Sequence, residues 1–162
     1  MTEKTKVTTP TDREIVITRI FDAPRELVWR TAMDPDLIPR WWGPARLKTT
    51  VERMNVRPGG TWRVVQRDTD GTEYGFHGEY REVVPPRRVI QTFEFEGMPG
   101  HVSVETSTFE EVGGRTKLTI TERFDSVEDR DGMLGSGMEE GLTETHDRLE
   151  ALLAELQKGK KR

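Results

Sequence analysis

Five short turns rich in glycine and proline divide the middle of the sequence, and their spacing restricts the fold more than any other feature. They lie at residues 58–60, 70–71, 85–86, 97–100 and 113–114. Six runs with the character of strands lie around them, at residues 46–56, 61–67, 73–84, 87–96, 101–110 and 115–124. Parallel neighbours need a crossover of about a dozen residues, so strands joined by turns this short are predicted to form an antiparallel meander.

One more strand and two short helices are predicted before the meander. Residues 14–21 are rich in β-branched side chains and predict the first strand, which makes seven strands in all. Asp22 and Pro24 then provide a helix-capping residue and a proline suited to a first helical turn. A second short helix is predicted over residues 34–40, where Pro35 again follows an aspartate.

The segment after the meander, residues 127–157, predicts one long amphipathic helix. Its stripe of mostly apolar residues repeats at steps of three and four: Met138, Leu142, Thr145, Leu149, Leu152 and Leu156. A twisted sheet with one apolar face must cover that face, and this helix is the cover available. We therefore expect an α+β fold in which a seven-stranded antiparallel sheet curves around a long C-terminal helix, with two short helices between its first two strands.

Length and composition predict a single domain without a disulfide framework. The chain has 162 residues, and chains usually divide into domains only above about 250. We expect a flexible lead-in over 1–12, one domain over 13–157 and a basic tail over 158–162. The absence of cysteine removes disulfides, thiolate nucleophiles and cysteine-based metal sites. No apolar run approaches the roughly 18 residues of a membrane span, and no apolar leader follows Met1, so a cytoplasmic protein with no membrane partner is expected.

The charge distribution argues against nucleic acid as a partner. The net charge is −4, and Lys158, Lys160, Lys161 and Arg162 supply +4, so the rest of the chain carries −8. A body with that charge would repel the phosphate backbone.

Gly135, Gly137 and Gly141 fall in the first half of the predicted long helix. Each costs about 1 kcal/mol relative to alanine in a helix interior. One interpretation is that the missing side chains keep a space open beneath the helix, with Met138 as an adaptable lining. The alternative is close backbone packing, or a helix that begins only near Gly137.

Five motifs follow one another along the chain: ITRIFDAPRELVW at 17–29, WWGP at 41–44, RPGGTW at 57–62, GEYREVVPP at 78–86, and SGMEEG at 136–141 before Arg148 and Leu149. Together they resemble the bacterial Hsp90-ATPase-activator-like (AHSA1-type) family over about residues 13–157. That family belongs to the START-like (SRPBCC, Bet v 1-like) superfamily. The resemblance implies a helix-grip fold with a cavity between the curved sheet and the C-terminal helix. Relatives bind lipids, polyketides or hormones, and some are cyclases.

The expected function is therefore binding of a small hydrophobic molecule in such a cavity. We expect ten residues to line it: Trp41, Trp42, Trp62, Phe76, Tyr80, Phe93, Met138, Gly141, Leu142 and Thr145. Apolar walls would supply affinity, and a few polar groups would orient the ligand. No motif for a nucleophile, metal or cofactor accompanies these residues, so no cofactor is expected.

Two alternatives stay open. A cyclase- or hydrolase-type enzyme would need a histidine or carboxylate buried in the cavity with a shifted pKa. A protein-binding regulator of an Hsp90-type chaperone would need an exposed apolar patch. That partner is not expected, because the eukaryotic co-chaperone also uses a separate N-terminal domain and only about twelve residues precede the first predicted strand here. The resemblance also implies possible homodimers.

The histidines do not predict a site. His77, His101 and His146 show no metal-ligand spacing, and a surface or rim position is expected for all three. His146 lies next to Thr145 of the helix stripe, so an inward position is the alternative for this residue. His77 and Glu79 share one face of a predicted strand, and the aromatic residues of that strand lie on the other face. An acid–base pair of His77 with Glu79 would therefore point to solvent. Ser103 and Glu105 likewise share one strand face.

Overall fold

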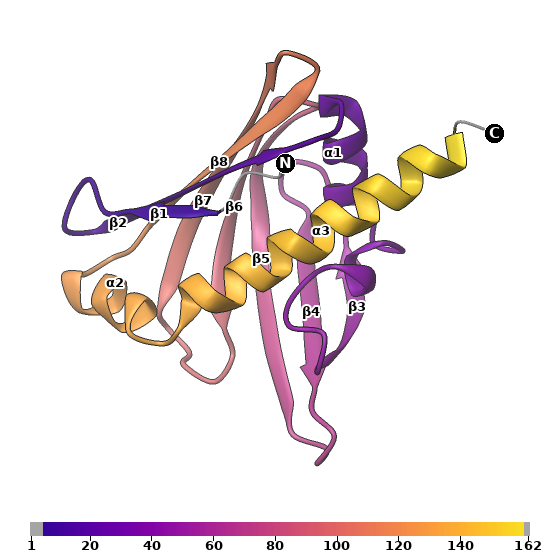
Figure 1. Cartoon of the computed structure of the whole chain (residues 1–162). Coiled ribbons are helices and arrows are strands. Elements are labelled where there is room, and N and C mark those ends of the chain that lie inside the picture. The colour runs from indigo at the N-terminus through magenta and orange to yellow at the C-terminus, as the bar shows by residue number, and fades with distance from the viewer. Residues whose placement is uncertain (1–4, 161–162) are drawn as a thin grey trace.

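A curved antiparallel sheet wraps around one long helix in the computed structural model, which describes residues 5–160 (Figure 1). The sheet has eight strands in the order β1-β2-β8-β7-β6-β5-β4-β3. The elements along the chain are β1 (Lys6–Thr8), β2 (Glu14–Phe21), α1 (Arg25–Met33), η1 (Ile38–Arg40), β3 (Lys48–Met54), β4 (Thr61–Arg67), β5 (Glu73–Val84), β6 (Arg88–Phe95), β7 (Val102–Val112), β8 (Arg115–Arg123), α2 (Val127–Leu134) and α3 (Met138–Lys160).

The antiparallel meander is confirmed, because β3 to β8 each pair with the next strand along the chain. The tightest turn joins β7 to β8 through Gly113 and Gly114, which have φ angles of +58° and +80°. Two successive positive φ angles match the twist of a hairpin and favour glycine at both positions. The sheet then continues through β2, which pairs with β8 along its full length.

The sheet has one strand more than the seven predicted. Residues 1–12 were expected to be a flexible lead-in, but β1 pairs with β2 from Lys6 opposite Thr18 to Thr8 opposite Val16. This strand was missed because three residues carry too little alternation to predict a strand. Residues 1–4 of the lead-in, and Lys161 and Arg162 of the basic tail, lie outside the described residues.

The long helix predicted over 127–157 is two helices. Ser126 caps α2 by accepting a 3.0 Å hydrogen bond from the Asp129 amide, and α2 ends at Leu134. Gly137 then has a φ of +81°, a conformation that ends a helix and favours glycine, and α3 begins at Met138. The alternative that the helix begins near Gly137 is therefore correct. The second short helix predicted over 34–40 is reduced to the single turn of η1, because Asp34 ends α1.

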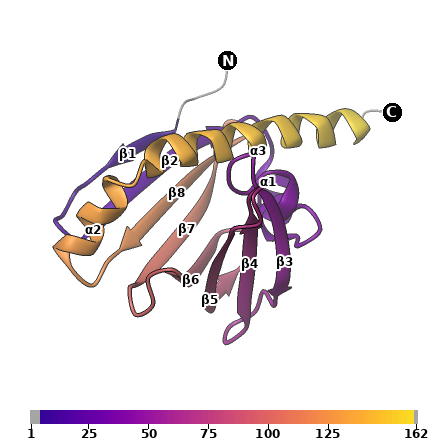
Figure 2. The ribbon, with the colours of Figure 1, turned by 90° about the horizontal axis from the view of Figure 1, so that it is seen from below.

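The middle of α3 packs on the main core. There Leu149, Leu152 and Leu153 are fully buried against α1 and the concave face of the sheet. Nearer the start of the helix, Met138, Gly141 and Leu142 are only half-buried. Figure 2 shows α3 crossing the concave side of the sheet, with α2 near β2 and β8. The first turns of α3 thus pack less closely on the sheet than the middle of the helix does.

None of the helices within residues 5–160 is apolar enough over a sufficient length to cross a lipid bilayer.

Candidate ligand cavity

A cavity of about 420 Å³ lies between the concave face of the sheet and the N-terminal half of α3. Its remaining walls come from α1, from the loop after η1 and from the end of α2. All ten of the residues that the sequence predicts to line a cavity lie on its walls: Trp41, Trp42, Trp62, Phe76, Tyr80, Phe93, Met138, Gly141, Leu142 and Thr145.

One wall is an aromatic cluster from three neighbouring strands and the loop after η1. The ring of Phe76 lies 5.6 Å from that of Phe93, and Phe93 lies 6.0 Å from Trp62. Trp42 meets Phe76 edge to face at 5.3 Å. Trp41 is buried in the core and Trp42 is half-buried, so the two adjacent tryptophans have different environments. Such a wall can bury flat or aliphatic apolar groups of a ligand without forming hydrogen bonds to the ligand.

The three glycines that follow Met133 have different structural reasons. Gly141 lines the cavity, and a Cβ atom built there would have no neighbour within 4 Å. Gly137 is required by its positive φ angle, and Gly135 forms the end of α2. The open-space interpretation therefore applies to Gly141 and does not apply to Gly135 or Gly137.

The loop at the edge of the cavity is fastened to α3. The Arg148 guanidinium donates hydrogen bonds to the carbonyl oxygens of Gly43 at 2.6 Å and Arg40 at 3.1 Å. The Glu144 carboxylate accepts a 2.7 Å hydrogen bond from the Ala45 amide. Position 43 requires glycine, because a Cβ atom there would lie 1.7 Å from the Gln66 amide nitrogen. These contacts hold the Trp41-Trp42 segment against the helix.

Two carboxylates that the sequence did not indicate also line the cavity. Glu105 of β7 and Glu122 of β8 are directly opposite each other in the antiparallel register, and the Ser103 hydroxyl donates a 2.7 Å hydrogen bond to Glu122. Burial raises the pKa of both carboxyls, and repulsion from Glu122 raises the pKa of Glu105 further. Each carboxyl of this pair is therefore harder to ionise than a carboxyl in water.

The reason these carboxylates were missed lies in the pattern of β7. Its valines, Val102 and Val104, alternate with Ser103 and Glu105, and the polar pair lies on the concave face. Apolar residues usually mark the buried face of a strand, so the alternation in this part of β7 indicates the wrong face. The signal available was only that Ser103 and Glu105 share one face.

His146 is buried, so the predicted surface or rim position is wrong for this residue. It is 3% exposed, lines the cavity and packs edge to face on Phe21 at 5.6 Å. Its Nδ1 atom shares a 2.8 Å hydrogen bond with the Thr5 hydroxyl. Burial, aided by the positive charge of Arg19, lowers the pKa of His146 to about 4. The imidazole is therefore neutral at pH 7.

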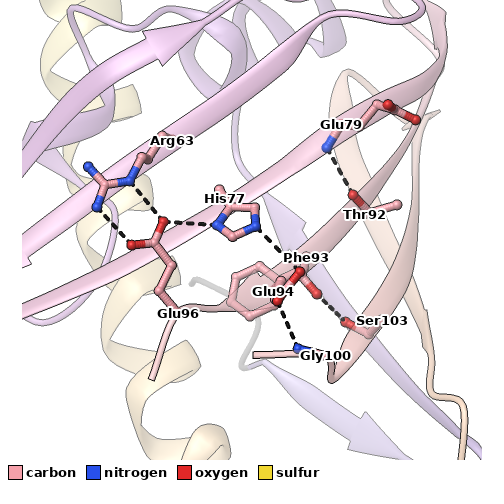
Figure 3. A network of polar contacts seen from close by, with 9 residues as sticks. All are labelled: Arg63, His77, Glu79, Thr92, Phe93, Glu94, Glu96, Gly100 and Ser103. Atoms are coloured by element: carbon pink, nitrogen blue, oxygen red, sulfur yellow. Dashed lines mark hydrogen bonds and ion pairs between the residues drawn. The ribbon is translucent and has the colours of Figure 1, made fainter. Parts of the chain in front are cut away.

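His77 lies on the outer face of the sheet, away from the cavity, as predicted (Figure 3). Its partners are Glu94 of β6 at 3.4 Å and Glu96, just after β6, at 2.8 Å, and it does not pair with Glu79. The guanidinium of Arg63 makes two hydrogen bonds to Glu96, of 2.7 and 2.8 Å, and lowers the pKa of that carboxyl to about 2. This network joins β4, β5 and β6 through half-exposed residues.

His101 is exposed and pairs with Asp129 at 2.8 Å. No group of three or more histidine, aspartate or glutamate side chains within residues 5–160 is arranged to hold a metal ion.

Comparisons with known proteins agree with this architecture. A protein from Rhodobacter sphaeroides has the same fold, with a TM-score of 0.89 and 24% identity over 94% of this chain and 99% of its own. A protein from Arthrobacter aurescens gives a TM-score of 0.84 at 29% identity, over 93% of this chain and 91% of its own. The AHSA1 protein from Silicibacter pomeroyi gives 0.71 at 25% identity, over 87% and 97%. A search of curated proteins found no match.

The model of one protein family matches residues 22–154, which is most of the chain. This range begins just after β2 and ends within α3, so it includes the cavity walls from α1, the meander and the helix. The chain therefore belongs to the family described as "Activator of Hsp90 ATPase homolog 1-like protein", and its helix-grip architecture is that of the START-like superfamily.

Proposed function

We propose that this protein binds a small, mostly apolar molecule in the cavity between the sheet and α3. The observation that carries the proposal is the cavity itself, of about 420 Å³, which lies beneath the N-terminal half of α3. Sites for small organic ligands usually measure about 300–1,000 Å³ and combine apolar walls with a few polar groups. The aromatic wall and Met138 would supply apolar contact, and the carboxylates would orient the ligand.

An acid–base enzyme is the second candidate, and one specific observation favours it. The Glu105–Glu122 pair provides the buried carboxylate with a shifted pKa that a cyclase- or hydrolase-type reaction would need. Mass spectrometry of any compound that copurifies can distinguish the two candidates. A binding protein would return the compound unchanged after incubation, whereas an enzyme would convert it or its precursor.

We do not propose an Hsp90-type chaperone as partner. Within the described residues, the exposed large apolar side chains are Val84, Met98, Val112 and Val127, which lie on four different strands, turns or helices. The cytoplasmic location and the homodimer expected from the sequence stay predictions.

Binding of the neutral fluorescent probe N-phenyl-1-naphthylamine tests the proposed function. The probe should bind the wild-type protein with a rise in its emission, and native mass spectrometry should detect the complex. Gly141→Leu should abolish binding, because the new side chain would occupy open space at the cavity wall. Ala154→Leu is the control: it introduces a leucine side chain at an exposed position of the same helix and should leave binding unchanged. Equal binding by the wild type and Gly141→Leu would reject this cavity as the site.

A further inference from the structure

A row of polar side chains crosses the concave face of the sheet inside the cavity. Gln91 of β6 lies opposite Glu105 of β7, which lies opposite Glu122 of β8. Directly opposite residues in an antiparallel pair have Cβ atoms about 4.5–5.5 Å apart and point to the same face. All three line the cavity, so their polar ends are available to one bound group.

Hydrogen-bonding capacity in this row is largely unused. The carboxylate of Glu105 has no hydrogen-bond partner within residues 5–160. Glu122 is 4% exposed, and its Oε2 atom accepts the hydrogen bond from Ser103 while its Oε1 atom has no partner among the described residues. These unpaired oxygens line the cavity, so a ligand that brings donors can form hydrogen bonds with them.

A second buried polar group independently faces the same cavity. His146 reaches it from α3, and its Nδ1 atom is occupied by Thr5 while its Nε2 atom has no hydrogen-bond partner within the described part of the chain. Unlike the carboxylates, this ring belongs to the helix wall. A polar ligand group in the cavity would therefore find unpaired atoms on both the sheet and the helix.

The charge of the side chains that line the cavity favours a positively charged hydrogen-bond donor. No lysine or arginine is among the described residues that line it, whereas two glutamates are. The nearby buried cation, Arg19, is engaged by Asp147 at 2.9 Å and by Thr5 at 3.2 Å. Two adjacent carboxylates repel each other, and a cation placed between them would favour their charged form and form charge-assisted hydrogen bonds.

We propose that the ligand is an amphiphilic amine, whose protonated nitrogen binds between Glu105 and Glu122 and whose apolar body lies along the aromatic wall. This inference rests on the proposed function, because it assigns an orientation and a chemical class to a molecule in the same cavity. An ammonium group supplies up to three N–H donors. These are enough for both carboxylates and for the side-chain carbonyl oxygen of Gln91. A fatty acid of similar length would instead place a third carboxylate beside two others.

Three ten-carbon probes that differ only in the head group test the inference. Decylamine, decanol and decanoate would each be titrated at pH 7 to displace N-phenyl-1-naphthylamine from the wild-type protein. Decylamine should bind at least about tenfold tighter than decanol, as one charge-assisted hydrogen bond can provide, and decanoate should bind most weakly. Equal affinities for decylamine and decanol would overturn the inference.

Matched variants separate the carboxylate pair from the general charge of the protein. In Glu105→Gln combined with Glu122→Gln, the affinity for decylamine should fall to that for decanol, while decanol binding is retained. Glu110→Gln removes one charge from an exposed position of β7 and should preserve the preference for the amine. A preference that survives the double substitution, or that Glu110→Gln also removes, would refute the role of the pair.

The two proposals fail in different ways. If neither the wild type nor any variant binds the probe, the cavity is rejected as a ligand site and this inference is rejected with it. Normal probe binding without discrimination among the head groups would reject the amine alone. Thermal unfolding of each variant verifies that it is folded, and the single variants Glu105→Gln and Glu122→Gln provide the same comparison if the double variant does not fold.

Discussion

Arg148 of α3 and Gly43 of the loop after η1 are joined by a hydrogen bond of 2.6 Å, which ties the helix to the segment that carries Trp41 and Trp42. The same guanidinium donates to the Arg40 carbonyl. Together with Glu144, which accepts from the Ala45 amide, Arg148 thus positions the loop that borders the cavity. We expect this contact to control how long a ligand stays bound.

Arg148→Ala should shorten the residence time of N-phenyl-1-naphthylamine. The substitution removes the charged group that donates hydrogen bonds to the carbonyl oxygens of Gly43 and Arg40. Hydrogen bonds to charged groups contribute about 1.5–3 kcal/mol, so the dissociation rate should rise at least tenfold. Stopped-flow fluorescence measures this rate. Lys158→Ala, at an exposed position of the same helix, is the control and should leave the rate unchanged. Unchanged dissociation in Arg148→Ala would show that the loop does not retain the ligand.

Glu105→Gln should increase the free energy of unfolding at pH 7 by more than the roughly 0.5 kcal/mol typical of surface substitutions. The pKa of Glu105 is raised in the folded protein by burial and by Glu122, so folding opposes its ionisation. This penalty is fully present above the folded pKa and vanishes below the unfolded pKa of about 4.5. Urea unfolding of both proteins between pH 4 and pH 8 measures it.

The difference between Glu105→Gln and the wild type should therefore shrink as the pH falls. Glu110→Gln, on the exposed side of the same strand, should show no such trend. A destabilised Glu105→Gln at pH 7 would mean that the carboxylate has a stabilising partner in solution.

His146 should make the folded protein less stable as the pH falls from about 6.5 to 4. Its pKa is lowered to about 4 by burial and by Arg19, with Asp147 opposing the shift, so the unfolded chain binds the proton first. The lost stability should reach about 3 kcal/mol, at 1.36 kcal/mol for each pKa unit. The measurable quantity is the pH dependence of unfolding in the wild type minus that in His146→Gln.

His101→Gln is the control, because His101 is exposed. Subtraction is needed because Glu105 and Glu122 change stability in the opposite direction over an overlapping range of pH. Parallel pH profiles for the wild type and His146→Gln would show that His146 titrates normally.

Two glycines four residues apart should respond to alanine with opposite signs. Gly141→Ala should stabilise the protein by about 0.5–1 kcal/mol, because a Cβ atom there meets nothing within 4 Å and alanine favours the helix. Gly137→Ala should destabilise it by about 1–2 kcal/mol, because its φ is +81°. Urea unfolding midpoints of the two variants provide the comparison, and equal effects would contradict the helix break between α2 and α3.

The sequence predicts the meander and the apolar part of the cavity because both depend on local signals. Glycine turns and the apolar stripe that includes Leu142 and Leu149 are properties of neighbouring residues, and the ten predicted lining residues follow from them and from the family resemblance. The polar part depends on the register between distant strands. Glu105 meets Glu122 only after β7 and β8 pair, and the outward valines of β7 conceal which face is inner.

The burial of His146 involves a contact between residues that are even farther apart in the sequence. Its partner Thr5 lies 141 residues earlier, in a segment where nothing predicted a strand. The break at Gly137 was one of the alternatives, and its positive φ decides it.

Because the Thr5 hydroxyl is hydrogen-bonded to His146, which lines the cavity, a residue that precedes the whole sheet takes part in the chemistry of the cavity. A truncation that removes Thr5 would alter the surroundings of the imidazole and change what a recombinant sample captures. The other end of the chain follows α3, whose last turns extend beyond the sheet in Figure 1. Purification handles placed after α3 would leave the contact between Thr5 and His146 unaltered.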